Sequence, residues 1–214
     1  PILALRVGNW GTRFVKWYYY LRLVGVKGLS IKDALITFIS GLAMAASPGK
    51  VAEILKCFII RNLAGTPIAT TIPTVIAERL TDGVAVLLLM VWSIAELARP
   101  EYMPVVAVSL AAIVIGVVIL TIRPLCIALL DVSARLPLIG KFATHFRAFY
   151  ESSYQIVQLP NLIFGVSTGL IGNLLDGLGV FLILIALGRP ATSETFFDGL
   201  LAISFSVVTG SISG

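Results

Sequence analysis

The chain has 214 residues with a formal net charge of +5, and 58% of its residues are hydrophobic while only 13% are charged. A soluble domain usually carries about a quarter charged residues, so this composition excludes an ordinary soluble domain and favours a single membrane domain. The basic residues stand between apolar runs, which suits topology control and lipid headgroups and excludes a nucleic-acid reader. The isolated Cys57, Cys126 and His145 predict neither a metal site nor a cofactor.

Residues 1–24 predict a first helix that ends in an aromatic cluster at residues 17–20, as expected at a membrane–water interface. Asn9, Arg13 and Lys16 interrupt this helix at spacings of i, i+4 and i+7, and therefore share one face. Such residues inside a span usually face the protein interior or a cavity. Alternatively, Lys16 reaches towards the interface, as Arg22 does, and serves only to fix topology.

Residues 30–64 contain two apolar runs on either side of Ser47-Pro48-Gly49-Lys50. Proline lacks an N–H group and glycine permits positive φ, so we expect the helix to break there. Each half is shorter than the roughly 20 residues that cross a bilayer, which predicts a re-entrant hairpin. Its second half begins beside Lys50 with unpaired N–H groups, a geometry that favours binding of a lipid phosphate. Glu53 and Lys56 lie within the following turns.

Four more apolar helices are predicted, over residues 68–98, 102–122, 160–187 and 195–214. The first of them carries Glu78, Arg79 and Asp82 near its start, and the i, i+3 spacing of Arg79 and Asp82 predicts an ion pair, either structural or part of a site.

The helix over 160–187 carries Asn173 and Asp176. Asn173 fits either a site or a helix–helix contact. Asp176 has no neighbour of opposite charge within its helix, which favours a functional role.

The segment 123–159 returns to alternating charged and apolar residues, which predicts helices lying along the cytoplasmic interface. The positive-inside rule places this segment and the connector 16–32 in the cytoplasm. Residues 1–122 would form a first repeat with its spans, and residues 160–214 the start of a second. Because the chain starts at Pro1 and stops at Gly214 inside apolar stretches, we expect it to be part of a longer polypeptide.

A repeat is visible in the spacing of polar residues. The order asparagine, glycine, serine occurs at Asn9, Gly25 and Ser30, and again at Asn173, Gly188 and Ser193. The two units run in opposite directions in the predicted topology, which is the signature of an inverted repeat. This repeat predicts a second helix break near residue 211 or beyond the end of the chain.

Three runs together resemble the lysylphosphatidylglycerol synthase transmembrane family of flippase-like membrane proteins: N-W-G-T-R-F-V-K-W at 9–17, S-P-G-K-V-A-E at 47–53 and E-R-L-T-D at 78–82. This family includes the membrane half of bacterial enzymes that aminoacylate phosphatidylglycerol, and membrane regions of archaeal dolichol-phosphate glycosyltransferases. The resemblance implies lipid translocation, re-entrant segments around a central cavity, and a further Pro-Gly-Gly loop after residue 214.

The leading hypothesis is therefore a flippase that moves an aminoacyl-phosphatidylglycerol-like phospholipid or a lipid-linked phosphate, such as a polyprenyl phosphate. Arg13, Lys50 and Arg79 would hold the phosphate, and acidic residues would balance the charge. The predicted headgroup site comprises Asn9, Arg13, Lys16, Pro48, Gly49, Lys50, Glu53, Lys56, Glu78, Arg79, Asp82, Asn173 and Asp176.

Two alternatives remain open. The chain could be a membrane anchor or scaffold for a lipid-modifying synthase or glycosyltransferase. It could also be an enzyme acting on a polyprenyl-linked sugar with Glu53 as its carboxylate, but the sequence shows no nucleophile–base arrangement, so transport or scaffolding is the stronger prediction. The oligomeric state and the lipid are not fixed by the sequence.

Overall fold

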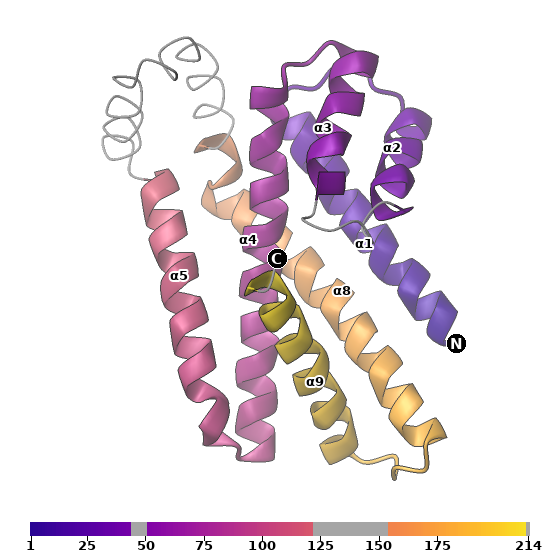
Figure 1. Cartoon of the computed structure of the whole chain (residues 1–214), viewed down its shortest axis with the longest axis vertical. Coiled ribbons are helices and arrows are strands. Elements are labelled where there is room, and N and C mark those ends of the chain that lie inside the picture. Colours follow the sequence, from indigo (N-terminus) through magenta and orange to yellow (C-terminus); the bar gives the residue numbers. More distant parts are fainter. Residues whose placement is uncertain (44–50, 122–153, 213–214) are drawn as a thin grey trace. The chain divides into compact units, whose positions relative to one another are not determined.

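The computed structural model describes residues 1–43, 51–121 and 154–212, and every regular element in these ranges is a helix (Figure 1). The helices are α1 (Ile2–Leu23), α2 (Ile31–Ala43), α3 (Val51–Ala64), α4 (Ile68–Leu97), the short 3₁₀ helix η3 (Pro100–Tyr102), α5 (Met103–Thr121), α8 (Leu159–Ala186) and α9 (Ser193–Ile212). The prediction of an all-helical protein is confirmed, and each apolar segment predicted above corresponds to a helix.

Within the described residues, α4 and α8 are long and apolar enough to cross a membrane by length and composition. Their 30 and 28 residues give helices of roughly 40–45 Å at ~1.5 Å per residue, against a hydrocarbon core of about 30 Å. The architecture is that of an integral membrane protein.

The chain forms two compact units. Unit 1 comprises Pro1–Lys16, Leu80–Val114 and Ile163–Gly214, and unit 2 comprises Trp17–Arg79 and Ile115–Leu162. Helices α1 and α4 each contribute residues to both units. The predicted single domain with its repeat boundaries stays a prediction.

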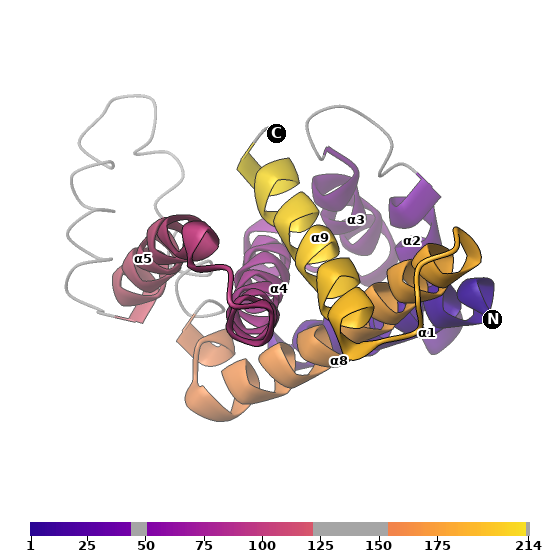
Figure 2. The same ribbon diagram turned by 90° about the horizontal axis from the view of Figure 1, so that it is seen from below.

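Unit 1 has a hydrophobic core of Leu87, Met90 and Ile94 from α4, with Val106 from α5 and Leu201 from α9. Helices α8 and α9 form an antiparallel pair (Figures 1 and 2). They approach closely at Gly177, where an added Cβ would lie 2.6 Å from the Leu200 Cδ1 atom. Small residues at such crossings allow membrane helices to pack without a hydrophobic driving force.

Unit 2 contains the antiparallel pair of α2 and α3, which pack against each other (Figures 1 and 2). Helix α2 starts with an N-cap, since the Ser30 hydroxyl accepts a hydrogen bond from the Asp33 backbone N–H at 3.1 Å. The aromatic end of α1 is buried here, with Trp17 and Tyr20 fully inaccessible. The Tyr19 hydroxyl donates to the Asn161 side-chain oxygen at 2.6 Å.

The two copies of the predicted sequence repeat, which are not the two compact units, share one local motif. Helix α1 ends with Gly25 at φ 83°, and α8 ends with Gly188 at φ 92°. In both, the following N–H reaches back five residues and the glycine N–H reaches back three, which is the Schellman arrangement. The Thr192 hydroxyl accepts a hydrogen bond from the Thr195 backbone N–H and so caps α9. This cap lies one residue before Ser193, the serine of the repeat.

Parts of the prediction fall outside the described residues. The Ser47–Lys50 break lies there, as does nearly all of the segment 123–159 that was predicted to be interfacial. Helix α9 continues through residue 211 to Ile212, so a second break does not occur before the end of that helix.

Candidate functional site

A connected set of polar side chains crosses unit 1, and we call it the unit 1 network. It comprises Arg6, Asn9, Arg13 and Lys16 of α1, Asp82 of α4 and Asp176 of α8. The shared face of the three α1 residues predicted from their spacing is confirmed, and Arg6 extends the same face by one turn.

At its inner end the network consists of a buried lysine–aspartate pair. The Lys16 ammonium donates to the Asp82 carboxylate and lies 3.5 Å from the Thr81 hydroxyl. The Lys16 side chain is only 1% exposed, so the alternative in which it reaches out to the interface is wrong. The Arg13 guanidinium lies 3.9 Å from the other Asp82 oxygen.

Asp82 therefore has partners in α1, whereas the sequence predicted a pair with Arg79 of its own helix. Spacing within α4 could not reveal them, because Lys16 is 66 residues away. Arg79 itself is exposed.

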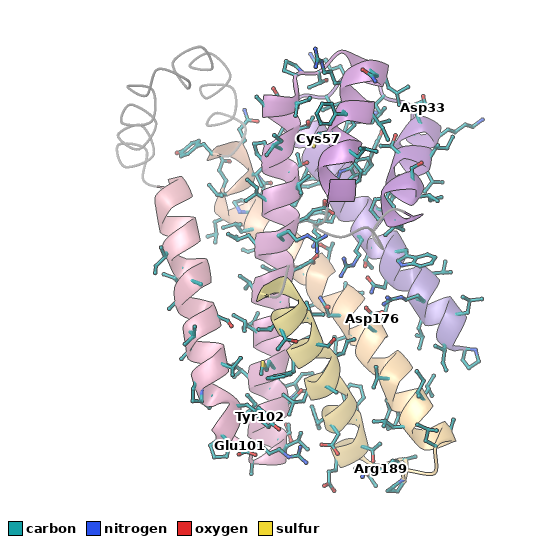
Figure 3. The ribbon with its side chains drawn as sticks, viewed as in Figure 1. Asp33, Cys57, Glu101, Tyr102, Asp176 and Arg189 are labelled. Atoms are coloured by element: carbon teal, nitrogen blue, oxygen red, sulfur yellow. The ribbon has the colours of Figure 1, made fainter. Side chains whose placement is uncertain are left out.

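At its outer end the network joins α1 to α8. The Arg13 Nε atom donates to the Asn9 side-chain oxygen at 3.1 Å, and the Asn9 amide donates to Asp176. Asp176, which lies midway along α8 (Figure 3), also accepts from Arg6 at 2.7 Å. Asp176 thus has partners, 167 and 170 residues away, so the lack of a local partner no longer argues for a functional role.

Close approach of α1 and α8 makes these contacts possible. An added Cβ at Gly172 would lie 2.8 Å from the Thr12 hydroxyl and 3.0 Å from the Asn9 side-chain oxygen. Any larger residue at this position would push the polar groups of α1 aside, since real Cβ atoms essentially never approach so closely.

The network carries an excess of positive charge. It contains three cations, Arg6, Arg13 and Lys16, and two carboxylates, so its formal charge is 3 − 2 = +1. Side-chain exposure rises from 1% at Lys16 to 29% at Arg13 and 53% at Arg6. The tightly paired lysine end is therefore buried, and the arginine end is more exposed.

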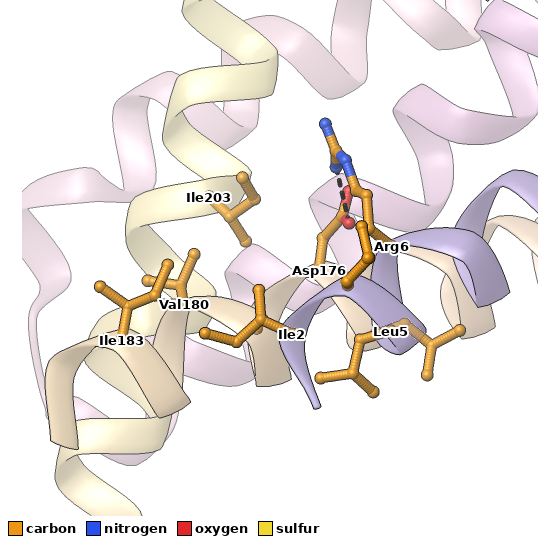
Figure 4. A pocket seen from close by; sticks show the side chains of 10 residues that line it. Ile2, Leu5, Arg6, Asp176, Val180, Ile183 and Ile203 are labelled. Carbon is orange, nitrogen blue, oxygen red and sulfur yellow. Dashed lines mark hydrogen bonds and ion pairs between the residues drawn. The ribbon is translucent and has the colours of Figure 1, made fainter. Parts of the chain in front are cut away.

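A cavity of about 390 Å³ lies beside the arginine end (Figure 4). Apart from Arg6 and Asp176 its lining is apolar, with Ile2 and Leu5 from α1, Val180 and Ile183 from α8 and Ile203 from α9. The Arg6–Asp176 ion pair is the polar feature of this wall (Figure 4). An apolar cavity with a few convergent polar groups is the usual form of a small-molecule site.

Unit 2 holds a second buried charge, which we call the Lys56 cluster. The Lys56 ammonium lies 3.6 Å from the Glu78 carboxylate. It also lies 5.3 Å from the ring centroid of Trp17 and 5.5 Å from that of Phe38. The sequence identified Lys56 and Glu78 as site residues but missed the two rings, because they lie in α1 and α2 and share no short-range pattern with α3.

The remaining predicted residues lie apart from both groups or outside the described residues. Asn173 is buried and donates to the Gly169 carbonyl of its own helix at 2.8 Å. Pro48, Gly49 and Lys50 lie outside the described residues, as does the side chain of Glu53, whose backbone belongs to α3. Arg6 was missed, although it lies three residues before Asn9, at helical spacing on the same face.

Comparison with known proteins gives one result. Residues 1–213 match the model of the family described as the lysylphosphatidylglycerol synthase TM region. No curated protein matches significantly. No solved structure matches significantly either. Since the match covers nearly the whole chain, this membrane protein belongs to the lysylphosphatidylglycerol synthase transmembrane-region family and is thereby linked to lipid metabolism.

Proposed function

We propose that this chain translocates an anionic phospholipid or a lipid-linked phosphate across the membrane, with the lipid phosphate bound at Arg6 and Arg13. The observation that carries the proposal is the excess positive charge of the unit 1 network beside an apolar cavity. An uncompensated charge within apolar helices is unfavourable and attracts a counter-ion. A lipid phosphate would supply that charge, while an acyl chain would fill the aliphatic cavity.

Arginine suits this role better than lysine. Its planar guanidinium offers five donors and binds phosphate oxygens in a bidentate fashion. Only one Arg13 donor is used in the short contact to Asn9, and the contact to Asp82 is long at 3.9 Å. Lys16, in contrast, already donates to a carboxylate and is shielded from solvent. Among the predicted phosphate-binding residues, Arg13 therefore has the best-supported geometry, and Lys50 and Arg79 stay predictions.

The proposal includes a re-entrant hairpin built from α2 and α3. These helices have 13 and 14 residues, too few to cross a bilayer, and their antiparallel packing puts residues 31 and 64 at the same end of the pair (Figures 1 and 2). The same end would face the cytoplasm of a prokaryotic plasma membrane. The matching Schellman turns at Gly25 and Gly188 support an inverted repeat.

The experiment is lipid movement in proteoliposomes that contain a headgroup-intact phosphatidylglycerol with a fluorescent acyl chain, followed by quenching from outside. We expect the double variant Arg6→Gln, Arg13→Gln to transport about 10²- to 10⁴-fold more slowly, because charge-assisted hydrogen bonds contribute ~1.5–3 kcal/mol each. The matched control is Arg61→Gln, which removes an exposed cation from α3. Undiminished transport by the folded double variant would rule out this phosphate site.

The same preparation tests the scaffold alternative. If the purified wild-type chain moves no lipid but retains a lipid-modifying synthase or glycosyltransferase through purification, then the chain is an anchor for that enzyme. Native mass spectrometry of the purified protein distinguishes the two, because a transporter would retain a phospholipid and an anchor would retain the protein partner.

A further inference from the structure

The Lys56 cluster holds its cation without a close hydrogen bond to its carboxylate. The Lys56 Nζ to Glu78 Oε2 distance of 3.6 Å exceeds the range of a direct hydrogen bond. The two ring centroids lie within the ~6 Å that a cation–π contact requires. The Trp17 and Phe38 rings are themselves neighbours, with centroids 5.7 Å apart. Thus, among the described residues, two adjacent aromatic rings and one carboxylate lie near the Lys56 ammonium group.

Two aromatic rings with a carboxylate form the kind of site in which proteins bind organic ammonium ligands. The attraction is mainly electrostatic and weakly directional, so it selects for charge and size and not for a lysine side chain as such. In this structure the ammonium is supplied by α3 itself. Lys56 therefore occupies the site as an internal ligand.

The path of the Lys56 side chain depends on a glycine of α2. An added Cβ at Gly41 would lie 2.8 Å from Lys56 Cδ and 2.9 Å from Cγ, so the missing side chain leaves room for the lysine stem. Lys56 and Glu78 are only 7% and 8% exposed. This low exposure favours replacement of the Lys56 ammonium over binding of a second ammonium beside it.

We propose that the Trp17–Phe38–Glu78 site binds primary ammonium groups, and that an amine-bearing lipid headgroup displaces Lys56 from it. The exchange leaves the buried Glu78 paired with a cation, because the lipid ammonium takes the place of the Lys56 ammonium. An unpaired carboxylate in an apolar interior would be costly, which favours this exchange over simple loss of the cation. The proposal rests on the proposed function for its lipid ligand and adds the chemical class of headgroup that unit 2 admits.

The first test needs no lipid. Lys56→Ala removes the atoms of a propylammonium ion and leaves the rings and the carboxylate in place. We expect n-propylammonium chloride to raise the Tm of Lys56→Ala in detergent and to leave that of the wild type unchanged. Equal concentrations of 1-propanol and sodium chloride control for apolar filling and ionic strength. The double variant Lys56→Ala, Glu78→Gln should lose the response. An equal Tm shift with 1-propanol would show that the Lys56→Ala cavity is filled by any apolar molecule without selectivity for ammonium, and would overturn the proposal. The absence of any Tm shift with propylammonium would also overturn it.

The second test keeps Lys56 and covers the case in which Lys56→Ala fails to fold. Native mass spectrometry of the full chain measures retention of short-chain phosphatidylethanolamine, which has an ammonium, and of short-chain phosphatidylglycerol, which has none. Glu78→Gln should lower retention of the ethanolamine lipid about tenfold, the equivalent of ~1.4 kcal/mol, and leave that of the glycerol lipid unchanged. The control Glu101→Gln removes an exposed carboxylate and should change neither. A parallel loss of both lipids would assign Glu78 a structural role only.

These outcomes separate the two proposals. Rescue by propylammonium can succeed even if Arg6 and Arg13 play no part in transport, because it involves only unit 2. Conversely, the arginine variants could lose transport while Lys56→Ala shows no selective response to propylammonium. That result would support the phosphate site and contradict the ammonium site.

Discussion

Each unit of the molecule buries a lysine in an apolar helix, but the two lysines are held in different ways. Lys16 of unit 1 is 1% exposed and donates directly to Asp82. Lys56 of unit 2 lies 3.6 Å from Glu78 and within 5.5 Å of two ring centroids. A direct ion pair fixes one helix against another at a single register, whereas a diffuse site can exchange its cation. Burial alone therefore does not reveal the role of a membrane lysine, and the geometry of its partners does.

The largest expected difference between the two lysine sites is in the stability lost when the carboxylate of Asp82 or of Glu78 is neutralised. Asp82→Asn leaves Lys16 buried without its direct counter-ion, so the free energy of unfolding should fall by about 3–5 kcal/mol. Glu78→Gln should lose only ~1–2 kcal/mol, because the two rings still attract the Lys56 ammonium. Denaturant titration of both variants in the same detergent measures the difference. Equal losses would show that the two lysines are held alike.

A smaller difference in stability between the two units is expected from adding a methyl group at Gly172 in unit 1 and at Gly41 in unit 2. At Gly172 the new Cβ meets Asn9 and Thr12, which packing holds in place, so Gly172→Ala should lose about 1–3 kcal/mol of unfolding free energy. At Gly41 it meets the flexible stem of Lys56, and the gain of ~0.5–1 kcal/mol in helix propensity should offset most of the strain.

The control for both glycine variants is Gly11→Ala, since an added Cβ there has nothing within 4 Å. It should stabilise the protein by the propensity gain alone. Thermal unfolding of the three variants side by side tests the order. If Gly172→Ala were as stable as Gly11→Ala, then the close contact of α1 and α8 would not position the unit 1 network.

The smallest effect on stability is expected at the outer end of the network. Asp176→Asn breaks an ion pair with Arg6, whose side chain is 53% exposed, and such pairs contribute about 0–1 kcal/mol. The expected effect is instead on transport, because the variant frees Arg6 for a phosphate and raises the charge of the network to +2. Tighter retention of phosphatidylglycerol in native mass spectrometry would bear this out, and a large loss of stability would mean that Asp176 is a structural residue.

The helices could be predicted from sequence because each apolar run is bounded by glycine, proline or a capping residue. Ser30 and Gly25 illustrate this, since their chemistry determines where one helix ends and the next begins. The shared face of Asn9, Arg13 and Lys16 could also be predicted, because it depends only on helical periodicity.

The partners of these residues could not be predicted. Asp82 and Asp176 come from helices that local spacing does not connect to α1. The Arg79–Asp82 pair seemed favourable because i, i+3 neighbours share a helix face, yet tertiary packing brings Lys16 and Arg13 to Asp82. The two rings near Lys56 were missed for the same reason. Trp17 was assigned to the interfacial aromatic cluster and Phe38 was not singled out, and only packing brings them together.

The long separation between network partners has a consequence for biogenesis. Helix α1 leaves the ribosome with its polar face unpaired, and Asp82 follows 66 residues after Lys16. At about 5–20 residues per second, that delay is roughly 3–13 s, and Asp176 arrives later still. During this interval Lys16 lacks the Asp82 carboxylate with which it pairs in the folded chain, so insertion of α1 alone among lipid tails is unfavourable. We therefore expect α1 to remain beside the insertion machinery until α4 emerges and to enter the bilayer together with it.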